Sequence, residues 1–297
     1  MTAQQRIDWA RGGAYGIASA ALFGLSAPLS KRLLPDTGPV LLAGLLYFGA
    51  GFGLTAVSVV RRRPWPDFNR RDWYKLAVIA LVGGFAAPVL LLIGFQRVSG
   101  VVGSLLLNLE AVFTMALAAM CFRDRLSMKE WIGVPFILGG ALLIQYGPGD
   151  LVADGLGVAA IAAACLGWGL DNNLTQRISS HDPIAIVQVK ALTAGAGNIL
   201  LATMASQHAL NWRVLASSLA VGFLCYGVSI VFDVYALRYV GAAREAALFA
   251  TAPFLGAVAA VPILGERLTR THVMSAALMA LGVLILRYGG QSTHQNV

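Results

Sequence analysis

The 297-residue sequence contains few charged side chains and no long polar segment. Charged residues make up 12% and hydrophobic residues 58% of the chain, and the mean hydropathy is +0.72. Soluble proteins carry about twice that fraction of charge, roughly 25%. Because this much apolar surface exceeds what a water-soluble core of this length can bury, the composition predicts a protein of the lipid bilayer.

The sequence also lacks the motifs of catalysis and of cofactor binding. It contains no GxSxG, HExxH, Walker A or paired aspartate-rich diphosphate motif. Its four histidines have no metal-ligand spacing, and its three cysteines lie in apolar segments as small hydrophobic residues. We therefore expect neither an enzyme nor a metal or cofactor. Without a nucleotide-binding domain, active transport would have to use a gradient or a separate partner.

Ten apolar runs dominate the sequence, and most approach the ~20 residues that cross about 30 Å of hydrocarbon. They cover residues 13–33, 39–60, 74–97, 100–122, 130–147, 155–177, 184–206, 214–238, 242–264 and 271–288. The runs show no polar alternation of period two, which excludes membrane strands. They predict an all-α membrane protein with ten transmembrane helices, of which 130–147 is the weakest span. The first run is too long for the apolar core of a signal peptide, so we expect it to be retained.

Segments of the first half reappear in the second half, about 145 residues later. The matched segments are FGLSAPLSKRL at 23–33 with WGLDNNLTQRI at 168–178, and FRDRLSMKEW at 122–131 with LGERLTRTHV at 264–273. We infer one transport domain built from two five-helix repeats, 13–147 and 155–288. Since each repeat contains an odd number of spans, the second must be inverted relative to the first. Inverted repeats support alternating access to a site near the midplane of the bilayer.

The basic residues predict the orientation of the chain. With the N-terminus in the cytoplasm, the inner loops and tails hold about fifteen Lys and Arg and the outer loops about six, which is the positive-inside bias. The connector after the second run contributes most, with Arg61, Arg62, Arg63, Arg70, Arg71 and Lys75. An even number of helices places both termini in the cytoplasm, in the inner (plasma) membrane. The net charge of +8 therefore belongs to membrane loops and does not indicate a nucleic-acid partner.

The sequence resembles the drug/metabolite transporter superfamily, and within it the EamA-type exporters. The resemblance rests on the ten-helix hydropathy, on the duplicated helix ends, and on Thr-Ala-Pro-Phe at 251–254 followed by Leu-Gly-Glu-Arg-Leu at 264–268. It extends over nearly the whole chain, although Ala111 stands where the second half has Pro253. The resemblance implies a central cavity lined by helices one, three, four, six, eight and nine. It also implies that helices five and ten pack at the side.

Glu110 lies near the middle of the fourth run. A charge at that depth costs roughly 2.5–3.5 kcal/mol on insertion scales, so Glu110 should face protein or water and not lipid. It is either a site for a proton, a cation or a substrate amine, or a hydrogen-bonded structural carboxyl. Asn108 lies two residues earlier on another helix face, and Asn172 belongs to the polar run 171–173 of the sixth helix. We take these three residues as candidates for substrate binding.

Lys190 of the seventh run requires a partner at its depth in the bilayer. Either Asp171 or Asp233 would remove most of the cost of both charges. We interpret such a pair as a structural lock between helices rather than an ion-coupling site. The alternative for the polar run 171–173 is that it forms a water-exposed helix end.

Five aromatic residues are candidates for the walls of the cavity. Phe23 and Trp168 occupy the same position in the two matched segments. Tyr226 and Tyr235 carry hydroxyl groups that need partners when buried, and Phe249 lies in the ninth run. For each of the five, simple packing is the alternative to substrate binding.

These features favour a secondary transporter or facilitator that exports small organic metabolites, with neutral or hydrophobic amino acids as the substrates. The sparse charge in the core argues against multiply charged substrates such as nucleotide sugars. Two alternatives stay open: efflux of lipophilic cations with Glu110 as counter-charge, and a non-transporting protein of membrane assembly or lipid handling. The expected partners are a small-molecule substrate and the lipid bilayer. The sequence leaves open whether two copies form a homodimer.

Overall fold

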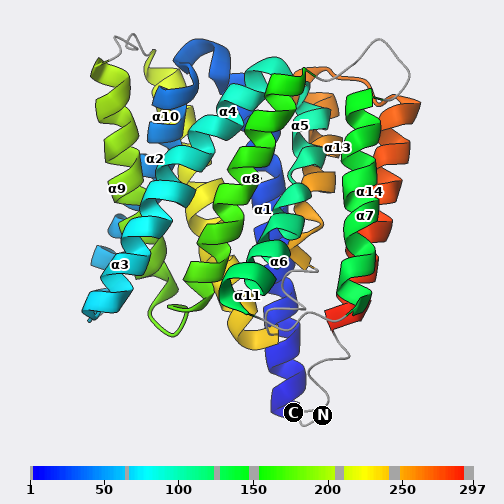
Figure 1. Ribbon diagram of the computed structural model, residues 1–297. Helices are drawn as coiled ribbons and strands as arrows, with labels where there is room; N and C mark the ends of the chain where they lie inside the picture. The colour runs from blue at the N-terminus through cyan, green and yellow to red at the C-terminus, as the bar shows by residue number, and fades with distance from the viewer. Residues whose placement is uncertain are drawn as a thin grey trace.

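The computed structural model describes residues 3–63, 67–123, 128–146, 154–204, 211–240 and 248–290. Every regular element in these ranges is a helix, which confirms the predicted all-α fold class. The elements are α1 (Ala3–Thr37), α2 (Pro39–Val60), α3 (Arg70–Val78), η1 (Ile79–Ala86), α4 (Ala87–Arg97), α5 (Gly100–Leu106), α6 (Leu109–Phe122), α7 (Met128–Tyr146), α8 (Gly155–Gln176), α9 (Pro183–Met204), α10 (Trp212–Val221), η2 (Gly222–Val228), α11 (Ser229–Val240), α13 (Ala252–Leu264) and α14 (Arg270–Gly290). Figure 1 shows them side by side in one bundle.

The membrane spans follow the predicted apolar runs. Seven helical stretches of the described chain are long and apolar enough to cross a bilayer: Trp9–Thr37, Pro39–Val60, Arg70–Arg97, Gly100–Phe122, Gly155–Gln176, Pro183–Met204 and Trp212–Ala236. The shorter apolar helices are Trp131–Gln145, Ala252–Leu264 and Arg270–Ile285. The weakest predicted span, 130–147, is one of these shorter helices. Residues 205–206 of the seventh run and 242–247 of the ninth lie outside the described residues.

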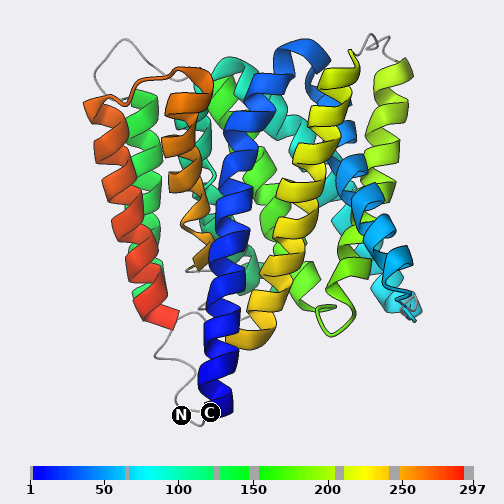
Figure 2. The ribbon, with the colours of Figure 1, turned by 180° about the vertical axis from the view of Figure 1, so that it is seen from behind.

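The helices run alternately between two faces of the bundle. α1 begins and α14 ends at the lower face in Figure 1, which we call the terminal face. The other face, which we call the opposite face, carries the turn at 98–99 and the segment 265–269. α1 runs away from the terminal face, whereas α8 runs toward it. α7 and α14 pack against each other at one edge of the bundle, as both views show (Figure 2).

Two membrane spans contain a π-helical segment that the sequence pattern did not predict. η1 interrupts the span Arg70–Arg97, and η2 interrupts the span Trp212–Ala236. In both, the residue after the segment donates its N–H five residues back: Ala87 to the Val82 carbonyl and Ser229 to the Leu224 carbonyl. Wide turns of this kind alter the backbone hydrogen bonds of a helix and are frequent at functional sites.

α1 and α13 approach each other through two glycines. A Cβ atom on Gly24 would lie 2.6 Å from the Ala252 carbonyl oxygen, and one on Gly256 would lie 2.7 Å from the Gly24 carbonyl oxygen. Only a residue without a side chain permits this approach, which brings the two backbones into direct contact.

An apolar groove of about 510 Å³ is lined by residues of α1 and α13 on the outer surface of the bundle. Its lining includes Leu25, Leu255 and Val258, whose side chains are all exposed. These side chains offer no polar group to a solute, so the groove suits the acyl chains of lipids. The candidate site for a polar substrate lies elsewhere, inside the bundle.

Candidate functional site

Four of the predicted aromatic residues meet in the centre of the bundle. The Phe23 ring on α1 lies 6.3 Å from the Trp168 ring on α8, 6.0 Å from the Tyr226 ring in η2 and 5.0 Å from the Phe249 ring. The contacts of Phe23 with Trp168 and Tyr226 are edge-to-face, a favourable geometry for aromatic pairs. We call these four residues the aromatic cluster. Three of them are buried, and Phe249 is partly exposed.

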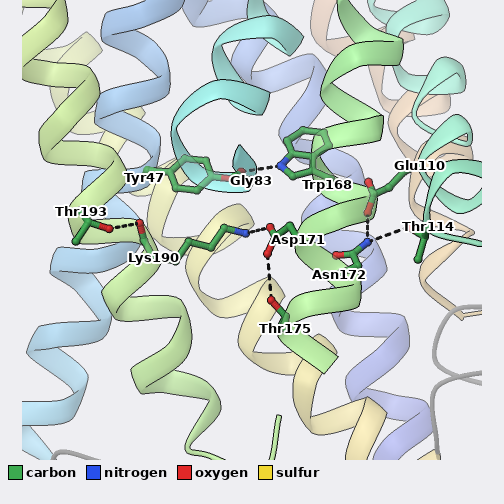
Figure 3. A network of polar contacts seen from close by, with 10 residues as sticks. All are labelled: Tyr47, Gly83, Glu110, Thr114, Trp168, Asp171, Asn172, Thr175, Lys190 and Thr193. Carbon is green, nitrogen blue, oxygen red and sulfur yellow. Dashed lines mark hydrogen bonds and ion pairs between the residues drawn. The ribbon is translucent and has the colours of Figure 1, made fainter. Parts of the chain in front are cut away.

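Tyr47 of α2 adjoins the aromatic cluster and was not predicted. Its ring centre lies 5.6 Å from that of Tyr226. Its hydroxyl donates to the carbonyl oxygen of Gly83 over 3.0 Å, and the Trp168 indole donates to the same oxygen over 2.9 Å (Figure 3). One signal was available: a tyrosine in the middle of an apolar run needs a partner for its hydroxyl.

Glu110 and Asn172 form a polar pair beside the aromatic cluster. The Asn172 amide donates to Glu110 Oε1 over 2.7 Å and reaches Thr114 Oγ1 at 3.5 Å. Glu110 and Thr114 belong to α6 and Asn172 to α8, as Figure 3 shows. The structure therefore brings together two of the three predicted polar candidates. Asn172 is exposed and Glu110 partly exposed.

Asn172 points toward α6, where it contacts Glu110 and Thr114 (Figure 3). Asn172 and Gln176 follow the buried Trp168 by about one and two turns of α8, and both are exposed. Because α8 runs toward the terminal face, these exposed residues lie on the terminal-face side of Trp168.

Asp171 and Lys190 form a buried ion pair between α8 and α9. The Lys190 ammonium donates to Asp171 Oδ2, and both residues are buried. Thr175 donates to the other carboxylate oxygen, Asp171 Oδ1, over 3.0 Å. Of the two partners considered for Lys190, the structure therefore selects Asp171. Such a pair requires both charges, because removal of one leaves the other uncompensated in a medium of low dielectric constant.

Asn108 and Tyr235 lie apart from the aromatic cluster and the polar pair. Asn108 is buried; its amide donates to the Leu105 carbonyl over 2.9 Å and approaches the Met279 sulfur of α14 at 3.7 Å. The Tyr235 ring stacks on Tyr15 at 5.5 Å, between α11 and α1. Their part in substrate binding stays a prediction.

At the opposite face, hydrogen bonds join residues from both halves of the chain. The Glu266 carboxylate accepts hydrogen bonds from the Gly100 N–H and, over 2.8 Å, from the Val101 N–H, so it caps the N-terminus of α5. The Lys31 ammonium of α1 donates to the Phe95 and Val98 carbonyls at the end of α4. These contacts hold the α4–α5 corner between two distant segments. Sequence reasoning noted Glu266 only as part of a family motif.

The EamA-like transporter family matches residues 10–146 and 155–288. The chain is 29% identical over 293 residues to an "Uncharacterized transporter" of Methanothermobacter thermautotrophicus, covering 93% of this chain and 85% of that protein. It is 27% identical over 293 residues to a "Probable amino-acid metabolite efflux pump" of Escherichia coli, covering 93% and 95%. A solved crystal structure has the same fold, with a TM-score of 0.70 at 16% identity over 93% of this chain and 97% of that chain. The chain is thus a multi-pass membrane protein, and it belongs to the EamA-like transporter family.

Proposed function

We propose that this transporter exports neutral amino acids with sizeable apolar side chains across the inner membrane by alternating access. The observation that carries the proposal is the aromatic cluster directly beside the Glu110–Asn172 pair. Pockets for small molecules combine an apolar wall with a few placed polar groups. An amino acid with an apolar side chain offers both chemistries in one molecule. The Escherichia coli relative, named as an amino-acid metabolite efflux pump, supports the same substrate class.

The polar pair supplies the contacts for the charged end of the substrate. The Glu110 carboxylate shares one oxygen with Asn172 and leaves the other for a substrate ammonium group. The Asn172 amide nitrogen donates to Glu110 and reaches Thr114 Oγ1, so it would exchange the longer contact with Thr114 for a substrate carboxylate. Lys190, the buried lysine at this depth within the described residues, is neutralised by Asp171. A multiply charged anion would therefore find no unpaired lysine here, which favours zwitterions over nucleotide sugars.

The access pattern supports loading from the terminal face. Asn172 and Gln176 are exposed on the terminal-face side of Trp168, whereas Glu266 and Lys31 join distant segments at the opposite face. If the positive-inside bias places the terminal face in the cytoplasm, the described state receives substrate from the cytoplasm. Export then requires that the opposite face open while the terminal face closes.

A second candidate function is the efflux of lipophilic cations. Its support is that the hydrogen-bond partner of Glu110 is the neutral amide of Asn172, while Lys190 is bound to Asp171. An accessible carboxylate beside aromatic rings attracts an organic cation by charge and by cation–π contact. The two candidates differ in whether the substrate needs a carboxylate as well as an ammonium group.

Transport by purified protein in liposomes tests both candidates. Over a panel of amino acids, we expect uptake of leucine or phenylalanine and none of glutamate. Trp168→Ala should slow transport of these large substrates more than that of alanine, because it removes part of the apolar wall. Trp212→Ala, which changes a tryptophan 71% exposed at the surface, is the matched control. Equal loss for large and small substrates, or transport of glutamate alone, would contradict the proposal. Transport of quaternary ammonium cations without amino acids would support the second candidate.

A further inference from the structure

The carbonyl group of Gly83 is available to side chains because of the local backbone. Within a helix, this oxygen would accept from the N–H of residue 87 in an α turn or residue 88 in a π turn. Ala87 donates its N–H to the Val82 carbonyl instead. Residue 88 is proline, which has no N–H. Neither residue of this fully described segment therefore bonds the Gly83 oxygen.

Two side chains from other helices fill both acceptor positions of this oxygen. The Tyr47 hydroxyl donates over 3.0 Å from α2, and the Trp168 indole N–H donates over 2.9 Å from α8. A carbonyl oxygen has two lone pairs, so this pair of donors saturates it. Both donor residues are buried, at 2% and 5% relative exposure. In this environment an unsatisfied hydroxyl or indole N–H is costly, so the two bonds fix both rings.

The site also depends on the absence of a side chain at residue 83. A Cβ atom there would lie 2.2 Å from Asp171 Oδ2, within the ion pair with Lys190. The Lys190 ammonium lies 6.0 Å from the centre of the Tyr47 ring. The ion pair therefore packs against the Cα of Gly83, the residue whose carbonyl binds Tyr47 and Trp168 (Figure 3).

We propose that Tyr47 and the Gly83 carbonyl are positioning groups that hold Trp168 in place and thereby set the size of substrate side chain that the site accepts. The inference rests on the proposed function. It adds the Gly83 carbonyl, which accepts a hydrogen bond from Trp168, and Tyr47, which donates to the same carbonyl. The hydrogen bond from Tyr47 keeps the oxygen oriented, and the oriented oxygen fixes the plane of the indole. A fixed indole gives a wall of constant position, which discriminates between large and small side chains more sharply than a mobile one.

The first test is Tyr47→Phe in liposomes, with transport of leucine and alanine measured separately. The change removes the hydroxyl and keeps the ring that packs against Tyr226. We expect the KM for leucine to rise by about twofold to tenfold, the equivalent of one net hydrogen bond. The KM for alanine and the maximal rates of both substrates should stay as in the unchanged protein. Tyr15→Phe, which removes a hydroxyl from the ring stack between α1 and α11, should leave both KM values unchanged.

The second test changes the backbone donor and leaves both aromatic residues intact. Pro88→Ala adds an N–H five residues after Gly83, so three donors then compete for two lone pairs. We expect the same loss of discrimination between leucine and alanine as in Tyr47→Phe. The double variant should lose no more than either single variant, because both changes release the same indole. Replacing proline within a helix removes no hydrogen bond, so this variant should fold even if Tyr47→Phe does not.

The outcomes separate this inference from the proposed function. If the unchanged protein transports no neutral amino acid, the proposed function fails. If it transports leucine, and both Tyr47→Phe and Pro88→Ala keep the original ratio of KM values, the positioning role is overturned. A fall in maximal rate with an unchanged KM ratio would also overturn it, since that result indicates a general effect on transport.

Discussion

Glu110 combines a position inside the bundle with partial access to solvent. Its carboxylate receives the Asn172 amide at one oxygen and lies beside Thr114. A structural carboxyl in hydrocarbon would be enclosed, whereas the Glu110 side chain is partly exposed. This arrangement favours the interpretation as a substrate-amine site over that of a structural carboxyl.

Glu110→Gln tests this interpretation. Glutamine keeps the acceptor for Asn172 and removes the negative charge, so the protein should fold normally. We expect transport of leucine to fall toward that of its 2-hydroxy analogue, which lacks the ammonium group, because the charge-assisted hydrogen bond is gone. Uptake of the two compounds in liposomes measures the preference for leucine over its 2-hydroxy analogue. An unchanged preference in the variant would leave Glu110 with a structural role only.

The Asp171–Lys190 pair should stabilise the fold only when both charged side chains are present. Lys190→Met leaves the Asp171 carboxylate buried without its partner, and we expect a loss of about 3–5 kcal/mol in unfolding free energy. The double variant Asp171→Asn with Lys190→Met should recover most of the loss. Thermal unfolding in detergent measures the difference. Arg97→Gln is the control, because its pair with Asp154 is 45% and 41% exposed and contributes about 0–1 kcal/mol.

At this scale, residue type and position predicted part of the site. The matched positions of Phe23 and Trp168 identified two rings that do meet, and the polar residues 110 and 172 are in contact. Tyr47 was missed because its partner is a backbone carbonyl that becomes available only through the π turn. Asn108 approaches Met279 of α14, apart from Glu110, as the two-residue spacing between them predicts. Its part in substrate binding stays a prediction.

Among the elements, the cap on α5 is the contact most directly tied to closure of the opposite face. The carboxylate of Glu266 follows α13, yet it satisfies the first N–H groups of α5, which lies more than 160 residues earlier in the chain. A helix N-terminus carries a partial positive charge, so the carboxylate compensates it. In the proposed alternating-access cycle, opening of this face would separate these groups.

Glu266→Ala should therefore loosen the opposite face. Loss of an N-terminal cap costs about 0.5–2 kcal/mol, which predicts an increase of about twofold to thirtyfold in the open population. The reporter is the variant Ser104→Cys, at a position that is buried against Gly256. The measured quantity is the rate at which a hydrophilic thiol reagent, added at the opposite face, labels this cysteine. Asn211→Ala is the control, because Asn211 caps the start of its own helix, α10. Equal labelling with and without Glu266 would show that the cap does not restrain this face.

The spans could be predicted from composition because a bilayer requires a set length of apolar helix. The π segments could not, since the sequences of η1 and η2 are mainly apolar, as those of regular membrane helices are. Pro88, shortly after η1, indicates altered backbone hydrogen bonding there. η2 is followed by Ser229, and no proline marks it. The choice between α and π turns there depends on tertiary contacts. One of these is the reciprocal hydrogen bonding of Ser229 with Ser19 of α1.

For the molecule as a whole, orientation is the prediction with the widest consequences. We expect the terminal face to be cytoplasmic, since it carries the basic connector that begins at Arg61. Single cysteines at Arg61 and Arg32, both exposed and at different faces, should be labelled from opposite sides of the membrane in intact cells. Labelling of the Arg61 position from outside would reverse the topology. It would also turn the proposed exporter into an importer in the described state.

The inverted relation between residues 13–147 and 155–288 also belongs to this scale. We predict that a pseudo-two-fold axis in the membrane plane superimposes the two repeats. The opposite starting faces of α1 and α8 agree with this relation (Figure 1). An experimental structure in which the opposite face is open would test it. In that state, the second repeat should adopt the arrangement that the first has here.

The two π segments affect how the chain tolerates changes in length. Deletion of one residue from an ordinary membrane helix rotates everything beyond it by about 100° and turns lipid-facing side chains inward. A π turn already holds one residue more than an α turn, so a deletion within η1 would leave a regular α-helix. The helical residues before and after the deletion would keep their side chains on the same faces of the bundle. The bundle would persist, and a deletion before Gly83 would place the Ala87 N–H opposite the Gly83 oxygen, which would then regain a partner in its own helix. Relatives that differ by one residue at this place should therefore share the architecture and differ in the molecules that they carry.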